Sequence, residues 1–117
     1  MVKNEKRRIE VYFLWIEEII TKIFLYTKWY DYDHFVQDQK TIDAVLMMLI
    51  QLWEVAFQIE HHYPKNDLSH IKALKAMRNF LVHAYHRIDT NIVWDTIQKD
   101  IPILLEEIKR LLNQNNK

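Results

Sequence analysis

The chain of 117 residues contains no cysteine and no glycine, and only two prolines. Without cysteine it can form no disulfide, and it offers neither a thiolate nucleophile nor a thiolate zinc ligand. Without glycine it lacks the residue that tight β-hairpin turns favour and the loops that cradle phosphates in many nucleotide-binding proteins. These absences disfavour a β-protein and require that any phosphate be held by side chains or helix ends.

Long apolar runs are scarce as well, although 50% of the residues are hydrophobic. No run reaches the roughly eighteen residues that a membrane span needs. The apolar stretch near the N-terminus is interrupted by Glu10, Glu17, Glu18 and Lys22, which is unlike a signal peptide or a membrane anchor. The length suits one domain, residues 1–117. We therefore expect a single-domain, cytoplasmic protein that does not interact with membranes.

Apolar residues recur every three to four positions in four segments, which predicts four helices. These segments are 9–30, 42–57, 68–81 and 93–111. Pro64 supports a break after the second segment, and Asp89 and Thr90 are good N-caps for the fourth. Pro102 should kink the last helix or begin a new segment. With short connections, this pattern predicts an all-α, antiparallel up-and-down bundle of four to five helices.

Basic and acidic residues balance at 16 each, but they are unevenly placed. The segment 68–88 has no Asp or Glu, and it carries Lys72, Lys75, Arg78 and Arg87 together with His70, His83 and His86. A basic, acid-free helix in a neutral chain is typical of a phosphate-binding surface. The alternative is a solvated helix face whose charges are balanced by acids on a neighbouring helix.

Residues 78–85 read Arg-Asn-Phe-Leu-Val-His-Ala-Tyr. An arginine can hold a phosphate with a planar fork of donors, and a histidine can move a proton near neutral pH. On an ideal helix Arg78 and His83 lie roughly 140° apart around the axis, so one helix does not aim both at the same atom. Either the helix ends or bends near His83, or a second copy of the chain completes the site in a symmetric dimer.

Such a cleft could cleave RNA without a metal, with the 2′-hydroxyl as nucleophile. His83 would remove or donate a proton, and Arg78 would stabilise the charge that develops on the phosphate. The chain has no HExxH motif and no cysteine, so we expect neither a metal nor another cofactor. In the competing structural interpretation, His83 and Tyr85 are satisfied polar groups at a helix end, and Arg78 forms an ion pair between subunits.

The chain resembles the HepT family of HEPN-domain toxins, the ribonuclease halves of bacterial and archaeal toxin–antitoxin pairs. The signature of that superfamily is Arg, a polar residue, three to five residues, His, any residue and Tyr. Here it is carried by Arg78, Asn79, His83 and Tyr85. Flanking segments are also similar to the family, upstream at 35–45 and downstream at 87–102. The likeness covers roughly residues 9 to 110.

Two family features differ in this chain. Family members usually carry Gly-Glu-Ala on the second helix, where this chain has Trp53, Glu54 and Val55. The usual Pro-Trp before the third helix is replaced around Ser69 and His70. Because a glycine lets helices approach closely, we expect altered packing at that crossing. This change concerns the dimer more than the active residues.

The resemblance implies a homodimer with a composite active site at the interface. Arg78 and His83 would be catalytic there, with Asn79 in support. The surrounding basic residues, Lys72, Lys75, His86 and Arg87, would contact RNA. The cognate antitoxin would be a small nucleotidyltransferase of the MntA type, which transfers AMP from ATP to the motif tyrosine, here Tyr85. Bulky negative charge beside Arg78 would block the cleft and repel RNA.

The function that follows from this resemblance is a metal-independent endoribonuclease toxin of a type VII toxin–antitoxin system. One alternative is a non-catalytic HEPN subunit that binds nucleotide or substrate for a partner nucleotidyltransferase. Another is a dimeric helical scaffold without an active site. The intact motif favours the ribonuclease, because neither alternative needs all four of its residues.

Overall fold

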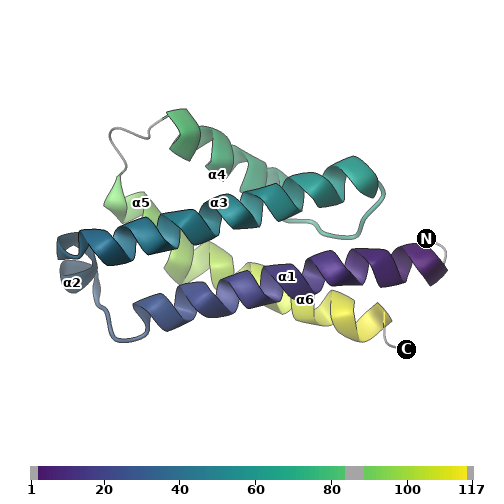
Figure 1. Cartoon of the computed structure of the whole chain (residues 1–117), viewed down its shortest axis with the longest axis horizontal. Coiled ribbons are helices and arrows are strands. Elements are labelled where there is room, and N and C mark those ends of the chain that lie inside the picture. Colours follow the sequence, from purple (N-terminus) through teal and green to yellow (C-terminus); the bar gives the residue numbers. More distant parts are fainter. Residues whose placement is uncertain (1–2, 84–88, 116–117) are drawn as a thin grey trace.

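The computed structural model describes residues 3–83 and 89–115, and the side chains of residues 7–79 and 89–114. Long helices run in alternate directions, and α1 begins at the end of the molecule where α6 ends (Figure 1). The predicted all-α, up-and-down bundle is confirmed. Its elements are α1 (Lys3–Thr27), α2 (Tyr32–Gln37), α3 (Gln39–His62), α4 (Ile71–His83), α5 (Thr90–Asp95), a π-helical turn η2 (Thr96–Asp100) and α6 (Ile101–Asn115).

The body of the bundle consists of α1, α3 and α6, with α1 packed against both of the others. Each helix contributes a stripe of aliphatic side chains at spacings of three or four residues, as the sequence pattern predicted. Burying one such side chain contributes about 1.5–3 kcal/mol, so these stripes hold the helices together. The residues with no exposed surface include Ile16, Ile20, Ile23, Leu49, Leu52, Ile101 and Ile108.

A short helix, α2, precedes α3 and was not predicted as a separate element. Asp38 ends α2 and caps α3, since its side chain accepts a hydrogen bond from the backbone N–H of Thr41 at 3.1 Å. The hydroxyl of Tyr30 also donates to this carboxylate. These hydrogen bonds, from Tyr30 first and then from Thr41, lower the pKa of Asp38. The break therefore depends on a tyrosine from the preceding connection as well as on the aspartate.

The last helical segment changes its winding before Pro102, as expected for a proline at that position. The π-helical turn η2 ends at Asp100, and Pro102 then lies in the first turn of α6. Helical backbone continues from η2 into α6, since the N–H of Ile101 bonds to the carbonyl of Thr96, so Pro102 removes one hydrogen bond from a continuous segment and the π turn is the local adjustment before it. At the other end of the segment, Asp89 accepts from the backbone N–H of Asn91 at 2.9 Å, which confirms the predicted N-cap of α5.

One described helix, α3, is long and apolar enough to cross a membrane by length and composition, with a mean hydropathy of 1.6. The sequence contains no uninterrupted apolar run of this length, because polar residues interrupt α3 at intervals, but the mean hydropathy of the helix is high enough. The central helix of a helical bundle passes the same test, since both of its sides contact other helices. Here the buried residues of α3 from Ile42 to Ile59 face the core.

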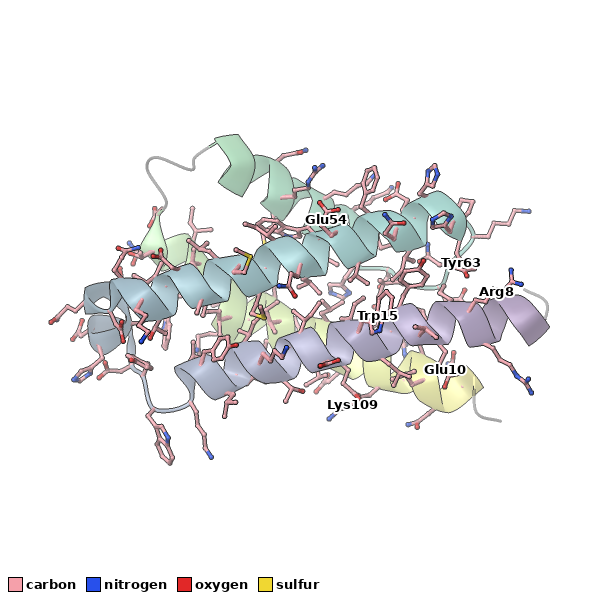
Figure 2. All side chains as sticks on the ribbon, viewed as in Figure 1. Arg8, Glu10, Trp15, Glu54, Tyr63 and Lys109 are labelled. Carbon is pink, nitrogen blue, oxygen red and sulfur yellow. The ribbon has the colours of Figure 1, made fainter. Side chains whose placement is uncertain are left out.

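Aromatic side chains connect α1 to the end of α3. The ring of Tyr12 makes edge contacts with Trp15 at 5.3 Å and with Tyr63 at 6.0 Å between centroids. Figure 2 shows Trp15 and Tyr63 on the facing sides of these two helices. Phe35 lies in the core, and Tyr12, Tyr26 and Tyr30 pack against it. Trp29, which is 86% exposed, does not.

Candidate functional site

The first part of the motif lies on α4, which packs against α3. Ile71 and Leu74 are buried, and Met77 packs against the core in a partly buried position. This spacing of three residues gives α4 one apolar edge, and the rest of its described surface faces outward. The C-terminal end of the helix stands away from the body of the bundle (Figure 1). Arg78 and Asn79 are therefore presented at the surface rather than enclosed in the core.

The structure places some of the predicted site residues and not others. Arg78 and Asn79 are exposed on α4, as are Lys72 and Lys75. His83 is the last residue of α4, and its side chain lies outside the described part of the structure. The remaining predicted site residues lie outside the described residues altogether: Tyr85, His86 and Arg87.

The backbone of α4 decides one point that the spacing left open. The helix continues without a break from Ile71 to His83. No bend therefore brings Arg78 and His83 to the same side, and the two residues start from faces roughly 140° apart on a regular helix. Of the alternatives, a helix that ends at His83 and a site completed by a second copy remain.

A groove runs between α3 and α4 beside Arg78. It has a volume of about 210 Å³ and is lined by Trp53, Ala56, Phe57, Leu74, Lys75, Arg78 and Asn79. The guanidinium of Arg78 lies over the ring of Phe57, with its carbon 5.7 Å from the ring centroid. Phe57 was predicted to belong to the buried stripe of its helix, but it is 46% exposed. It lies on the side of α3 that faces α4, where the shorter helix leaves it open to solvent.

The basic face of α4 is partly neutralised by α3. The Nζ atom of Lys75 lies 2.6 Å from Oε1 of Glu60, and both side chains are partly exposed. For Lys75 the alternative interpretation, in which a neighbouring helix supplies the balancing acid, is therefore correct. Among the described residues, Lys72 and Arg78 form no such ion pair. The groove continues past this pair, where Phe57, Glu60, His61 and Lys75 line a further 290 Å³.

The start of α4 is fixed to α6 by a buried carboxylate. Glu107, only 6% exposed, accepts hydrogen bonds from the Ser69 hydroxyl and from the backbone N–H of His70. Nδ1 of His70 lies 2.9 Å from Oε2 of Glu107, and it donates because a carboxylate only accepts. Burial raises the pKa of Glu107, but these hydrogen bonds outweigh it and the net pKa is lowered.

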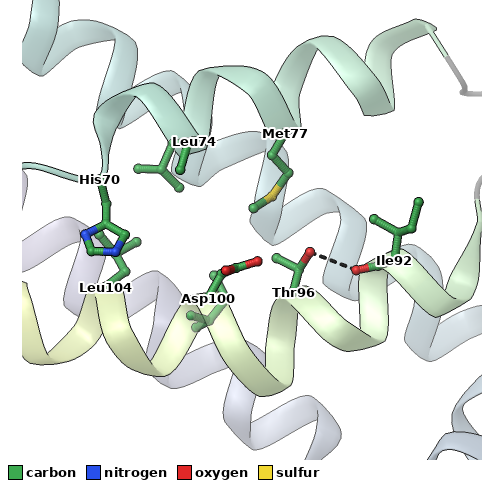
Figure 3. A pocket seen from close by; sticks show the side chains of 9 residues that line it. His70, Leu74, Met77, Ile92, Thr96, Asp100 and Leu104 are labelled. Carbon is green, nitrogen blue, oxygen red and sulfur yellow. Dashed lines mark hydrogen bonds between the residues drawn. The ribbon is translucent and has the colours of Figure 1, made fainter.

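A second cavity, of about 170 Å³, lies on the opposite side of α4, towards α5 and α6. Figure 3 shows His70, Leu74 and Met77 of the α4 side facing Ile92, Thr96, Asp100 and Leu104. The hydroxyl of Thr96 donates to the backbone oxygen of Ile92 at 2.8 Å, so its hydrogen is used within the helix. Neither Arg78 nor Asn79 lines this cavity. The α3–α4 groove is therefore the better candidate for the site.

Sequence reasoning missed Glu107 and the exposure of Phe57. Glu107 stands within the apolar stripe of the last helix, beside Leu104 and Ile108, and a charged residue at such a position signals a buried polar contact. Phe57 gave no comparable signal, because its exposure depends on where α4 crosses α3. In the described part of the chain, no three His, Asp or Glu side chains are grouped so that they could hold a metal ion.

Comparison with known proteins adds an independent observation. The family model described as "Ribonuclease HepT-like" matches residues 16–111. The chain is 29% identical over 107 residues to "Probable ribonuclease HepT" of Thermococcus cleftensis, covering 91% of this chain and 97% of that protein. It is also 29% identical over 109 residues to "Putative RNase MJ0125" of Methanocaldococcus jannaschii, covering 92% of this chain and 93% of that protein.

A third relative is longer than this chain. It is "Gamma-glutamylcyclotransferase and putative RNase MJ0434" of Methanocaldococcus jannaschii, 29% identical over 119 residues. The match takes in 96% of this chain but only 53% of that protein, so the chain spans about half its length. No solved structure matches the chain.

Proposed function

This chain belongs to the HepT-like ribonuclease family, and from that premise we propose that it is itself a metal-independent endoribonuclease. The observation that carries the proposal is the position of Arg78. It is exposed at the edge of a groove on a helix whose described residues include no acid, and it forms no ion pair with a described residue. A guanidinium at such a place is suited to hold a phosphate.

The proposed reaction is an internal transfer within RNA. The 2′-oxygen attacks the adjacent phosphorus while its proton passes to a base, and the 5′-oxygen leaves with a proton from an acid. His83 is the residue that we assign to proton transfer, and Arg78 stabilises the negative charge on the phosphoryl oxygens. The products are a 2′,3′-cyclic phosphate and a 5′-hydroxyl end, and no water or metal is consumed in this step.

The faces of α4 lead us to place this site at a dimer interface. The helix is continuous from Arg78 to His83, which puts the two positions on faces roughly 140° apart, and this supports the proposal that a second copy completes the site. In a symmetric pair, Arg78 of one copy and His83 of the other could meet at one phosphate. Mixing Arg78→Ala and His83→Ala protomers should then restore part of the activity through one intact composite site.

We further propose that the protein is a toxin acting on cytoplasmic RNA, in a type VII pair with an MntA-like nucleotidyltransferase. The antitoxin would transfer AMP to Tyr85. This residue is seven positions after Arg78, and its added negative charge would compete with RNA phosphates. Tyr85→Phe should retain ribonuclease activity but escape inhibition by the antitoxin with ATP. Mass spectrometry of the wild-type pair should show AMP on Tyr85, and an adduct on another residue would contradict this assignment.

The deciding experiment for catalysis is cleavage of single-stranded RNA by the purified chain in excess EDTA. We expect cleavage to persist and the products to carry 2′,3′-cyclic phosphate ends, identified by mass spectrometry. A requirement for an added divalent cation would contradict the mechanism. RNA binding without any cleavage would instead favour a non-catalytic subunit.

A further inference from the structure

We propose that the α3–α4 groove holds an unpaired base of single-stranded RNA, with Phe57 as the stacking residue beside the phosphate-binding Arg78. This inference rests on the proposed function and adds to it a subsite for one unpaired base. Its basis is the juxtaposition on two helices of an exposed aromatic ring, a guanidinium and an amide, contributed by Phe57, Arg78 and Asn79.

The sequence explains why these groups meet. Trp53, Phe57 and Glu60 recur at spacings of four and three residues, so they share the side of α3 that faces α4. On α4, Lys75 and Asn79 are four residues apart, and Arg78 is three after Lys75. The crossing of the two helices therefore alternates aromatic and basic side chains along one groove. Interleaved aromatic and basic groups are the pattern of surfaces that bind single strands, where bases stack and cations follow the backbone.

Phe57 is placed for binding rather than for core packing. It is 46% exposed, although it belongs by sequence to an apolar stripe. The guanidinium of Arg78 over its ring adds a second flat surface at the edge of the groove. Every base has a flat aromatic face, and it can stack on either surface. A base in a duplex is already stacked between its neighbours and is not available to these surfaces. The Phe57 ring and the Arg78 guanidinium should therefore bind unpaired nucleotides in preference to paired ones.

The wall of the groove carries an unused hydrogen-bond donor. Trp53 is only 3% exposed, and its indole N–H has no hydrogen-bond partner among the described residues. Buried donors nearly always have an acceptor, so one without a partner requires an explanation. Bases carry carbonyl oxygens and ring nitrogens that accept hydrogen bonds. The Trp53 nitrogen itself has almost no accessible surface, so a base in the groove would reach this donor only after a rotation of the indole.

The charges of the groove place the phosphate near Arg78. Glu60 already neutralises Lys75, at 2.6 Å, in the part of the groove nearer the end of α3. Arg78 lies one helical turn further along α4, away from that acid, and has no ion-pair partner among the described residues. A nucleotide whose base stacks on Phe57 would thus direct its phosphate towards Arg78 and the motif.

The test measures binding separately from cleavage. The probe is a fluorescein-labelled, single-stranded 2′-O-methyl RNA of ten nucleotides, which cannot be cleaved through its 2′-oxygen, and a duplex of the same sequence is the comparison. Fluorescence anisotropy gives the Kd for the full-length wild type, Phe57→Ala and Phe57→Trp. Phe57→Ala should weaken single-strand binding by about tenfold, the loss expected for one stacked base, and leave duplex binding unchanged. Phe57→Trp should keep wild-type affinity.

Trp29 supplies a matched control. It is an exposed aromatic residue with a cation, Nζ of Lys28, 5.0 Å from its ring centroid, but it lies in the turn after α1 and does not line the α3–α4 groove. Trp29→Ala should change neither Kd. Melting temperatures and light scattering for each variant report folding and association. The indole in Phe57→Trp keeps both a stacking surface and a large side chain. Wild-type affinity in this variant would show that binding needs an aromatic ring at position 57 and not phenylalanine itself.

Other results would overturn the inference. An equal loss of single-strand and duplex binding would mean that Phe57 only positions Arg78. A change in the molecular mass of Phe57→Ala would mean that the ring is a contact between copies of the chain. Unchanged Kd values for Phe57→Ala, in a wild type that binds and cleaves RNA, would remove the base subsite and leave the ribonuclease proposal intact. A wild type that binds no RNA would contradict both.

Discussion

The α1–α3–α6 body and the motif helix α4 use their side chains in opposite ways. In the body, each long helix buries a continuous stripe, and Leu49 on α3 has no exposed surface. In α4 the buried residues are confined to one edge, and Arg78 and Asn79 face solvent. Stability and the proposed chemistry therefore depend on different residues. The two properties should respond independently to substitution.

The largest expected effect is on activity alone. Arg78→Ala and His83→Ala should each reduce RNA cleavage by about 100-fold or more, because each removes a group that acts on the reacting phosphate. Among the residues that the structure describes, the exposed Arg78 makes only a cation–aromatic contact, with Phe57, so the melting temperature of Arg78→Ala should stay within a few degrees of the wild type. A large loss of stability in that variant would show that the motif also supports the fold.

The complementary substitution acts on the body. Leu49→Ala removes a fully buried side chain and should lower the free energy of unfolding by about 2–5 kcal/mol. Urea denaturation followed by circular dichroism measures this change. At a temperature where the variant remains folded, its cleavage rate per folded molecule should match the wild type. A rate that falls with Leu49→Ala while the chain is still folded would contradict the separation.

Glu107 connects the two regions, so its replacement should affect both moderately. Glu107→Gln removes the charge that accepts hydrogen bonds from Ser69 and His70 and should cost about 1–3 kcal/mol. Because the folded pKa of Glu107 is lowered, its stabilising contribution is present above the ordinary glutamate pKa of about 4.3. That contribution is lost as the pH falls through the folded pKa.

The measurement for Glu107 is therefore a pair of denaturation series against pH. The gap in unfolding free energy between the wild type and Glu107→Gln should close as the pH is lowered below about 4. The control is Glu106→Gln, which changes an exposed neighbour on α6. Its unfolding free energy should match that of the wild type at every pH. A gap that persists unchanged in acid would mean that the charge of Glu107 contributes nothing to the contact.

The smallest expected effect concerns the balance of charge in the groove. Glu60→Gln would release Lys75 from its ion pair and remove one negative charge near the proposed RNA path. Single-strand binding should tighten by about two- to fivefold at low salt, and the difference should shrink as salt screens the charges. Stability should hardly change, since an exposed ion pair contributes about 0–1 kcal/mol. Weaker RNA binding by Glu60→Gln would contradict the proposed path.

The helical body was predictable because its apolar residues repeat with the helical period, and Pro64, Asp89 and Pro102 mark its boundaries. Two local features were not. The break at Asp38 depends on the hydroxyl of Tyr30, eight residues earlier in the chain, and no periodicity records that contact. The π-helical turn before α6 has no signal except the proline that follows it.

The candidate site was predictable in its residue types and not in its contacts. The surface position of Arg78 and Asn79 follows from the apolar spacing of Ile71, Leu74 and Met77, which fixes the opposite face of α4. By contrast, the pairing of Lys75 with Glu60 and the exposure of Phe57 depend on how α3 crosses α4. The position of the Trp53 indole in the groove wall likewise depends on this crossing.

The π-helical turn has a consequence for changes in chain length. A π turn carries about one more residue per turn than an α-helix, so deleting one residue between Thr96 and Asp100 would remove the π turn. Pro102 would then lie inside a continuous α-helix, where it cannot donate a backbone hydrogen bond and its ring clashes with the preceding turn. The deletion would also rotate α5 by about 100° against α6. Val93 would leave the core, and Trp94 would lose its contact with Phe35. Deleting one residue from this segment should therefore be less well tolerated than many substitutions within it.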